Sequence, residues 1–361
     1  MSQPLTLDTY RLLGRSGLRI SPLALGTMTF GTDWGWGADE SEARRIFDTY
    51  VDRGGNFIDT ANCYTDGASE RFLGAFAQSS RDRLVIATKY TVPTRKDDAN
   101  SGGNHRKSLV RSVEESLTRL KTDYLDLLYL HAWDFTTPVD EVLRAMDDLV
   151  RAGKLLYVGI SDTPAWQVSR MQAIADLRGW SPLIALQIEY SLIERTVERD
   201  LIPMAKEMGL GVIPWSPLAS GVLSGKYTRD ELTSGTSGDT GTRRDFAIAN
   251  GVLTERNLTI ADVVRDIAME IGKSPSQVAL AWTLLEPGVT APIVGARTLE
   301  QFEDNLGALD VVLSMDQQSR LCSASAIELG FPHDFLARDT TRKVMFGDLK
   351  LAVQSKEYLR C

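Results

Sequence analysis

An aspartate, a tyrosine, a lysine and a histidine in the first part of the chain lie at or just after the ends of short apolar runs. Side chains of these four types can act together in a proton-transfer reaction. Asp59, Lys89 and His131 each end such a run, and Tyr64 lies in the loop after Asp59. A free tyrosine has a pKa of about 10, so it is a poor acid at neutral pH unless a nearby cation favours its anionic form. A lysine could lower that pKa, and an aspartate would keep the lysine charged. The phenol would then be a usable general acid.

A histidine beside such a phenol could donate a hydrogen bond to a carbonyl oxygen and so polarise the carbon that receives a hydride. The set therefore suits carbonyl reduction, or secondary-alcohol oxidation in reverse. Each residue type also has an ordinary structural use, because strand-end aspartates often cap helices, tyrosines pack, rim lysines are solvated and lone histidines lie in cores. Their joint appearance at successive strand ends favours the catalytic interpretation.

The elements that must position these residues alternate regularly between strand and helix. Strands are predicted at 23–28, 57–59, 84–89, 124–131, 155–160, 183–187, 211–215 and 289–294. Helices are predicted at 42–53, 69–77, 107–120, 139–151, 164–176, 197–208, 258–271, 275–285 and 298–309. Eight such units predict a parallel sheet closed into a (β/α)8 TIM barrel, whose βα loops converge on one face. An open doubly wound sheet is the alternative, but no Gly-x-Gly-x-x-Gly follows the first strand.

The barrel predicted at about 19–309 is flanked by two further segments. Residues 10–20 read as two short strands around a turn at 14–17, a hairpin that could plug the bottom of the barrel. Residues 310–361 form a tail in which 331–335 could fold over the mouth. The Gly-, Thr- and Ser-rich stretch 228–242 predicts a long flexible loop. We expect one domain spanning 1–361.

The composition favours a globular protein without a nucleic-acid, membrane or metal partner. The proportions of hydrophobic (43%) and charged (24%) residues are ordinary for a soluble globular protein, and the net charge of −8 argues against a nucleic-acid partner. No apolar run is long enough to span a bilayer, and the N-terminus lacks a signal-peptide pattern, so we expect no membrane partner and a cytoplasmic location. Three histidines and three widely spaced cysteines predict no metal site.

Several motifs, in order along the chain, resemble the aldo-keto reductase superfamily and its bacterial aryl-alcohol-dehydrogenase-like branch. The similarity runs from about Tyr10 to Leu309. The motifs are Leu-Gly-Arg-Ser-Gly-Leu at 13–18, Asn-Phe-Ile-Asp-Thr-Ala at 56–61, Val-Gly-Ile-Ser at 158–161, Trp-Ser-Pro-Leu-Ala-Ser-Gly-Val-Leu-Ser-Gly-Lys-Tyr at 215–227, and Ile-Val-Gly-Ala-Arg-Thr-Leu-Glu-Gln-Phe-Glu-Asp-Asn-Leu at 293–306.

The resemblance implies a role for each of the four residues and a cofactor. Tyr64 would be the general acid, Lys89 and Asp59 the pair that tunes it, and His131 the residue that orients the carbonyl. NADP(H) would donate or accept the hydride, and a small-molecule carbonyl or alcohol would be the substrate. Arg297 could bind a 2′-phosphate and so favour NADP, with NAD as the other possibility.

The resemblance also implies which residues bind the cofactor. Ser161, Asp162 and Gln187 would hold the nicotinamide carboxamide, and Tyr190 or Trp215 would lie beneath the ring. The remaining candidates are Gly26, Thr27 and Met28 after the first strand, Ser216, Leu218, Gly221 and Lys226 around the pyrophosphate, and Gly295, Ala296, Arg297, Gln301 and Asn305 at the adenosine end.

Asp162 departs from the family pattern, which usually has Asn after the serine. A carboxylate can accept hydrogen bonds from a carboxamide nitrogen but has no amide hydrogen to donate, so cofactor affinity or geometry could differ. Aromatic residues in or just after the mouth loops predict a pocket for a bulky apolar carbonyl or alcohol. They are Phe30, Trp34, Trp36, Tyr90 and Trp133.

Two other functions compete with the reductase. The first is a cofactor-binding regulatory subunit, because channel-associated proteins resemble the same family and keep its catalytic residues. The second is a barrel that isomerises or hydrolyses sugars without a cofactor. Steady turnover of simple carbonyls would argue against the first, and dependence on a nicotinamide cofactor would argue against the second.

Overall fold

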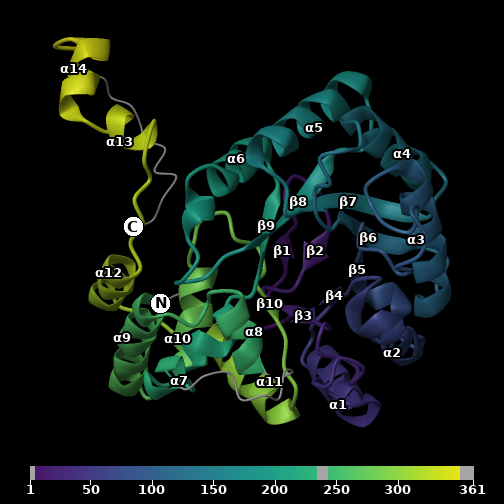
Figure 1. The fold of residues 1–361 in the computed structure, drawn as a ribbon, viewed down its shortest axis with the longest axis horizontal. Coiled ribbons are helices and arrows are strands. Elements are labelled where there is room, and N and C mark those ends of the chain that lie inside the picture. Colours follow the sequence, from purple (N-terminus) through teal and green to yellow (C-terminus); the bar gives the residue numbers. More distant parts are fainter. Residues whose placement is uncertain (1–4, 234–242, 350–361) are drawn as a thin grey trace.

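A computed structural model describes residues 5–233 and 243–349. Within them, eight parallel strands form one sheet in the neighbour order β10-β3-β4-β5-β6-β7-β8-β9, with helices outside it (Figure 1). The strands are β3 Ala24–Gly26, β4 Phe57–Asp59, β5 Val85–Tyr90, β6 Leu125–Leu130, β7 Leu155–Ser161, β8 Leu183–Glu189, β9 Gly211–Trp215 and β10 Ile293–Val294.

The two edges of this sheet meet at the segment before β10. Val212 of β9 forms a parallel bridge with Val289, and the Thr290 amide donates to the Val212 carbonyl at 2.8 Å. Further along the same segment, Ile293 pairs with Ala24 of β3. The predicted strand 289–294 is therefore divided between its two neighbours, and its regular part is short. The predicted (β/α)8 TIM barrel, nearly closed, is confirmed.

The strands are continuously apolar because both of their faces are buried, as the parallel arrangement requires. All six residues of β5 and all six of β6 are buried. Ile86 and Leu128 point to the outer core beneath the helices, whereas Val85 and Leu127 belong to the inner core of the barrel. This alternation has the period of two that a strand imposes.

An antiparallel hairpin of β1 (Arg11–Leu12) and β2 (Arg19–Ile20) precedes the barrel. Leu13 and Ile20 are fully buried in the inner core, so the hairpin closes the amino-terminal end of the barrel as predicted.

Every predicted helix has a counterpart in the structure, with bounds that differ by a few residues at most. These helices are α1 Glu40–Asp52, α2 Ala68–Phe76, α3 Arg106–Leu120, α4 Val139–Arg151, α5 Ala165–Arg178, α6 Leu201–Met208, α9 Glu255–Ile271, α10 Pro275–Leu284 and α11 Leu299–Leu306. The structure also has α7 Asp230–Thr233, α8 Arg243–Ala249 and α12 Met315–Ala324, which the sequence pattern does not predict. Helix α9 begins earlier than predicted because Thr254 caps it, accepting a hydrogen bond from the Asn257 amide. Helix α7 lies within the predicted loop 228–242, of which 234–242 fall outside the described residues.

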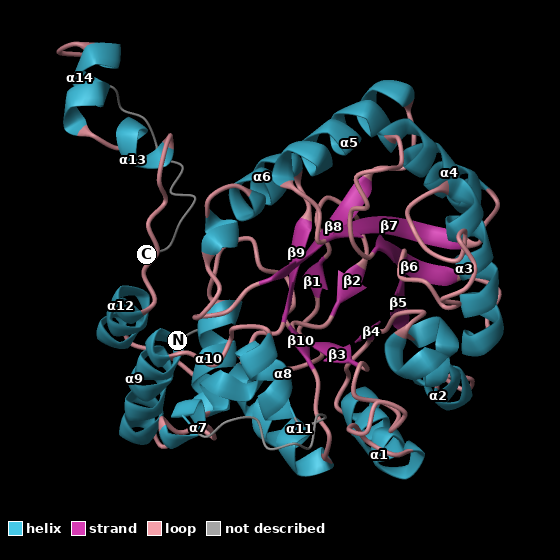
Figure 2. Cartoon of the chain, viewed as in Figure 1, coloured by secondary structure: helices cyan, strands magenta, loops and turns pink. Residues whose placement is uncertain are grey.

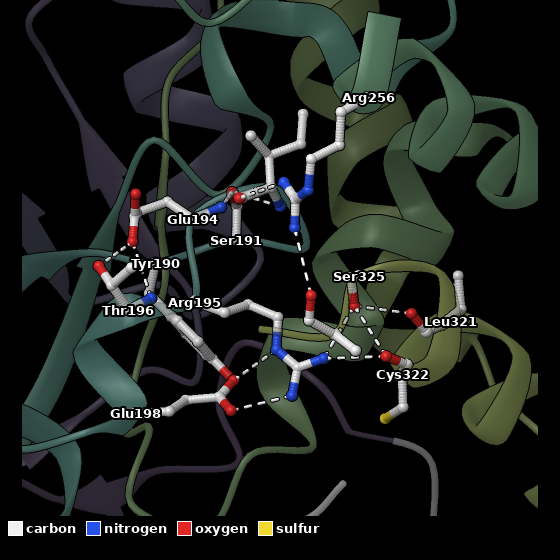
Figure 3. Close-up of polar contacts among 12 residues, drawn as sticks. Tyr190, Ser191, Glu194, Arg195, Thr196, Glu198, Arg256, Leu321, Cys322 and Ser325 are labelled. Atoms are coloured by element: carbon white, nitrogen blue, oxygen red, sulfur yellow. Dashed lines mark hydrogen bonds and ion pairs between the residues drawn. The ribbon is translucent and has the colours of Figure 1, made fainter. Parts of the chain in front are cut away.

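Helix α6 begins at Leu201 instead of 197 because Glu198 is drawn into a buried ion pair (Figure 3). Arg195 donates to both carboxylate oxygens of Glu198, at 2.8 and 2.9 Å. The guanidinium also donates to the Ser325 hydroxyl at 2.9 Å and to the Cys322 carbonyl at 3.2 Å. A single buried arginine thus joins the loop after β8 to the end of α12.

Beyond α12 the chain turns away from the barrel (Figure 2). Helices α13 (His333–Leu336) and α14 (Asp339–Phe346) lie outside the helical ring, and Phe331 is 85% exposed. The segment is held at the side of the molecule, where the Arg199 guanidinium donates to the Glu328 carbonyl at 2.6 Å. The expectation that 331–335 folds over the mouth is therefore wrong.

Candidate active site

A cavity of about 510 Å³ opens where the carboxyl ends of the barrel strands converge. Residues from the ends of seven strands line it. They are Gly26, Asp59, His131, Ser161, Gln187, Trp215 and Val294. Barrel enzymes use this end of the fold for chemistry, because the loops after all the strands meet there.

Lys89, Asp59 and Tyr64 form a connected group at the floor of this cavity. The Lys89 ammonium donates to Asp59 Oδ1 at 2.5 Å, to the Tyr64 hydroxyl at 3.0 Å and to the Thr60 carbonyl at 2.8 Å. The lysine side chain is completely buried and lies behind Tyr64, which faces the cavity. All three donor hydrogens of the ammonium are thus used.

The surrounding backbone and Gln187 hold this group in place. The Gln187 amide donates to Asp59 Oδ2 at 2.8 Å, so both carboxylate oxygens are engaged. The loop after Tyr64 turns sharply because Thr65 has a positive φ of 45°, and the Thr65 hydroxyl donates to the Phe30 carbonyl at 2.6 Å. Rigid strands and a fixed turn therefore aim the phenol.

The pKa of Tyr64 differs from the expectation. Burial raises it to about 12, because desolvation of the phenolate outweighs the attraction of Lys89. The expected lowering by the lysine exists, but it is the smaller effect. Burial would lower the pKa of Lys89, yet Asp59 and Tyr64 raise it above the ordinary value. At neutral pH the phenol is therefore protonated beside a charged ammonium.

His131 adds a neutral imidazole beside the phenol. Its ring centroid lies 6.0 Å from that of Tyr64, with the planes at 80°. Burial and the charge of Lys89 lower its pKa to about 3. Its buried Nδ1 has no hydrogen-bond partner among the described residues. The structure therefore brings the four predicted residues together at the floor of the cavity, where Asp59, Tyr64 and His131 line it and Lys89 lies behind them.

A second group of predicted residues lines the cavity at the ends of β7, β8 and β9. The Ser161 hydroxyl is buried and has no hydrogen-bond partner within the described part of the chain. Asp162 has a positive φ of 35°, and its Oδ1 accepts a hydrogen bond from the Trp215 indole at 3.0 Å. Gln187 also lines the cavity and joins this group to Asp59.

Tyr190, the alternative to Trp215, lies elsewhere. Its side chain is fully buried, and its hydroxyl donates to Glu198 at 2.8 Å (Figure 3). Its ring lies 5.5 Å from that of Trp282. Of the two aromatic residues predicted to lie under a nicotinamide ring, Trp215 lines the cavity and Tyr190 does not.

The cavity continues from Trp215 to the start of α11. The predicted residues that line this part are Ser216, Leu218, Gly221, Lys226, Gly295, Ala296, Arg297, Gln301 and Asn305. Gly221 has a φ of 89°, in the left-handed region that glycine adopts most readily, and it lies against the end of the Lys226 side chain. Arg297 is exposed at the far end.

Among the residues after the first strand, Gly26 and Met28 line the cavity but Thr27 does not. The buried Thr27 hydroxyl donates to the Asp59 carbonyl at 2.9 Å, so it joins β3 to β4. Sequence reasoning missed several lining residues, namely Thr29, Pro217, Ser220, Ser224, Ser276, Leu280, Ile293, Val294 and Asp304. Ser220 and Ser224 lie within the 215–227 motif, so that motif could have identified them as cavity-lining residues.

Two of the five predicted substrate residues lie near the phenol. Trp36 lines the cavity, and the Trp34 ring is 5.8 Å from that of Trp36 and 6.5 Å from that of Tyr64. The other three are buried away from it. Phe30 packs on Phe76 with ring centroids 6.5 Å apart, the Tyr90 hydroxyl donates to the Asn104 carbonyl at 3.2 Å, and Trp133 is 8% exposed outside the lining.

Neither a metal nor a membrane is indicated by the described residues. Among residues 5–233 and 243–349, no group of three or more His, Cys, Asp or Glu side chains could hold a metal ion. Over the same residues, no helix is both long and apolar enough to cross a bilayer.

Comparison with known proteins gives one consistent family. A model of the Aldo/keto reductase family matches residues 22–326. The aryl-alcohol dehydrogenase [NADP(+)] of Phanerodontia chrysosporium is 37% identical over 96% of this chain and 90% of its own length. An uncharacterized oxidoreductase of Bacillus subtilis is 40% identical over 85% of this chain and 93% of its own. Norsolorinic acid reductase of Aspergillus flavus is 36% identical, over 94% and 87% respectively.

The match covers the barrel and its carboxyl-end loops, and the relatives span nearly the whole described chain. The resemblance seen in the sequence motifs is confirmed. The chain belongs to the aldo/keto reductase family.

Proposed function

We propose that this protein reduces aldehydes and ketones with NADPH, and oxidises secondary alcohols in reverse, with Tyr64 as general acid and base. The observation that carries the proposal is the hydrogen-bonded group of Tyr64, Lys89 and Asp59 at the floor of an elongated cavity. Two relatives, an aryl-alcohol dehydrogenase [NADP(+)] and a norsolorinic acid reductase, support the same chemistry.

The residues along the cavity fit a nicotinamide dinucleotide. The buried, unsatisfied Ser161 hydroxyl suits a carboxamide, and Gly221 beside Lys226 on the cavity wall suits a pyrophosphate. Arg297 would hold a 2′-phosphate, with Gln301 near the start of α11 and Asn305 near its end also lining the cavity. When bound, the cofactor supplies the hydride that carbonyl reduction requires.

The residues at the floor of the cavity would donate the proton and stabilise the charge that remains. Tyr64 donates its hydroxyl proton to the carbonyl oxygen as a hydride bonds to the carbonyl carbon, so the π bond becomes a C–H and an O–H bond. The Lys89 ammonium, 3.0 Å away, stabilises the phenolate that remains. Asp59 keeps the lysine charged. His131, neutral at pH 7, can donate a hydrogen bond to the same carbonyl oxygen.

The rings of Trp34 and Trp36 would form the substrate side of the site. Both side chains are only partly buried, and the Trp34 ring lies within 6.5 Å of the Tyr64 ring. Flat aromatic walls suit a bulky aromatic aldehyde or ketone.

The test is the near-ultraviolet absorbance of NADPH with a panel of aromatic aldehydes, quinones and bulky ketones. We expect the purified protein to oxidise NADPH only when a carbonyl compound is present. A protein that binds NADPH but turns over neither carbonyls nor alcohols would be a binding subunit instead. Turnover of a sugar without cofactor would refute the reductase.

Arg297→Ala is expected to weaken NADPH binding by about tenfold to a hundredfold and to leave NADH binding nearly unchanged, because only NADPH carries the 2′-phosphate. Calorimetric titration of both cofactors measures this. Arg229→Ala is a matched control, since Arg229 is paired with Glu255 and Asp262 away from the cavity. An unchanged preference in Arg297→Ala would show that the arginine does not select NADP.

In the variant Glu189→Gln, kcat for carbonyl reduction is expected not to change with pH between about pH 6 and pH 9. With the pKa of His131 at about 3 and that of Tyr64 at about 12, neither group changes protonation in this range. Glu189 is replaced because burial, Glu194 and Asp162 raise its pKa to about 7. A bell-shaped profile in this variant would mean that another pair of groups transfers the proton.

A further inference from the structure

We propose that Asp162 makes the site discriminate between the two redox states of its cofactor, binding the oxidised, cationic nicotinamide more tightly than the reduced, neutral one. This inference rests on the proposed function and deepens it, because it assigns a residue that biases the bound cofactor. The carboxylate lies on the cavity wall between Ser161 and Trp215, where the nicotinamide end is proposed to bind.

The position of this carboxylate is fixed. The Asp162 amide donates to the Gln187 carbonyl at 3.3 Å, and the Asp162 carbonyl accepts from the Trp133 amide at 3.2 Å. The side chain is held by the Trp215 indole, which donates to Oδ1 at 3.0 Å. An indole is a neutral donor, so it orients the carboxylate without cancelling its charge.

The charge balance of this wall leaves Asp162 uncompensated. Lys89, the cation whose charge lowers the pKa of Asp162, is itself paired at 2.5 Å with Asp59. In the described part of the chain, Asp162 takes part in no ion pair. Burial, Glu194 and Asp162 raise the pKa of the other nearby carboxyl, Glu189, to about 7, so this group adds no positive charge. Partial desolvation raises the pKa of Asp162, while the indole and Lys89 oppose that shift.

A fixed negative charge acts differently on the two cofactor forms. A bound oxidised nicotinamide would carry a positive charge that this carboxylate would attract, whereas a bound reduced nicotinamide would be neutral. By stabilising positive charge on the ring, the same carboxylate would also favour the hydride transfer that the cofactor would supply. An amide in this position would accept the same indole hydrogen bond but would lack the charge.

The experiment measures the dissociation constants of NADP⁺ and NADPH by calorimetry in the wild type, Asp162→Asn and two controls. Asp162→Asn is expected to weaken NADP⁺ binding about tenfold and to change NADPH binding less than about twofold. Asn is nearly isosteric and tolerates the positive φ of 35°, so folding should be preserved. Circular dichroism of the variant checks this.

The controls separate charge from position. Asp304→Asn removes a carboxylate from the adenosine end of the same cavity and should change both constants alike. Trp215→Phe removes the indole hydrogen bond but keeps the Asp162 charge, so the preference for NADP⁺ should persist. Equal changes for both cofactors in Asp162→Asn would overturn the inference and leave the proposed function standing. A wild type that binds neither cofactor would overturn both.

Discussion

Tyr64→Phe is expected to lower kcat for aldehyde reduction by about a hundredfold to ten-thousandfold, the usual contribution of a positioned general acid, while the dissociation constant for NADPH stays within about twofold. The substitution removes the hydroxyl that accepts from Lys89 at 3.0 Å and keeps the ring, which lies 6.5 Å from Trp34 and beneath the Lys89 ammonium. Steady-state absorbance and calorimetry measure the two quantities.

Tyr157→Phe provides the matched control for this substitution. Tyr157 lies near the amino end of β7, is partly buried against the inner core, and is not among the residues that line the cavity. Removal of its hydroxyl should leave both kcat and the dissociation constant for NADPH unchanged. If the kcat of Tyr64→Phe were within about tenfold of the wild-type value, the proton would have to come from another group or from water.

Lys89→Met is expected to abolish measurable turnover and also to lower the free energy of unfolding by about 3–5 kcal/mol. The stability loss follows because the substitution leaves Asp59 buried without its cation, although Gln187 still donates to it. The loss of activity follows because nothing then stabilises the Tyr64 phenolate. Urea unfolding and NADPH oxidation measure the two effects.

The double variant Asp59→Asn with Lys89→Met separates these effects. A neutral pair of similar size should recover most of the lost stability, since no uncompensated charge remains. It should recover none of the activity, because the ammonium beside the phenol is still missing. Recovery of turnover together with stability would show that the lysine is structural only.

The sequence predicts the barrel because parallel strands buried on both faces appear as short apolar runs. The same reasoning places Asp59, Lys89 and His131 at one end of the sheet, since the runs end at or beside these residues and parallel strands share a direction. That the ammonium of Lys89 lies within 3.0 Å of the Tyr64 hydroxyl is a result of the structure. Sequence could predict only that the loop after Asp59 reaches the same face.

Side-chain direction and burial explain what the sequence could not predict. Tyr190 follows β8 closely, but its side chain turns into the outer core toward Glu198, which leaves the cavity wall to Trp215. The direction of the Tyr64 pKa shift depends on whether desolvation of the phenolate, which raises the pKa, exceeds the attraction of Lys89, which lowers it. The sequence alone does not show how deeply the phenol is buried. Phe30 and Tyr90 were predicted at the mouth because they are aromatic, yet both are core residues.

The most direct test of the central claim is a single turnover with NADPH deuterated at both C4 positions and an aromatic aldehyde, followed by mass spectrometry of the alcohol. The proposed mechanism predicts one deuterium on the carbinol carbon with the wild type and almost no alcohol with Tyr64→Phe in the same time. An alcohol formed without deuterium would contradict direct hydride transfer, and equal yields from the two proteins would contradict the role of Tyr64.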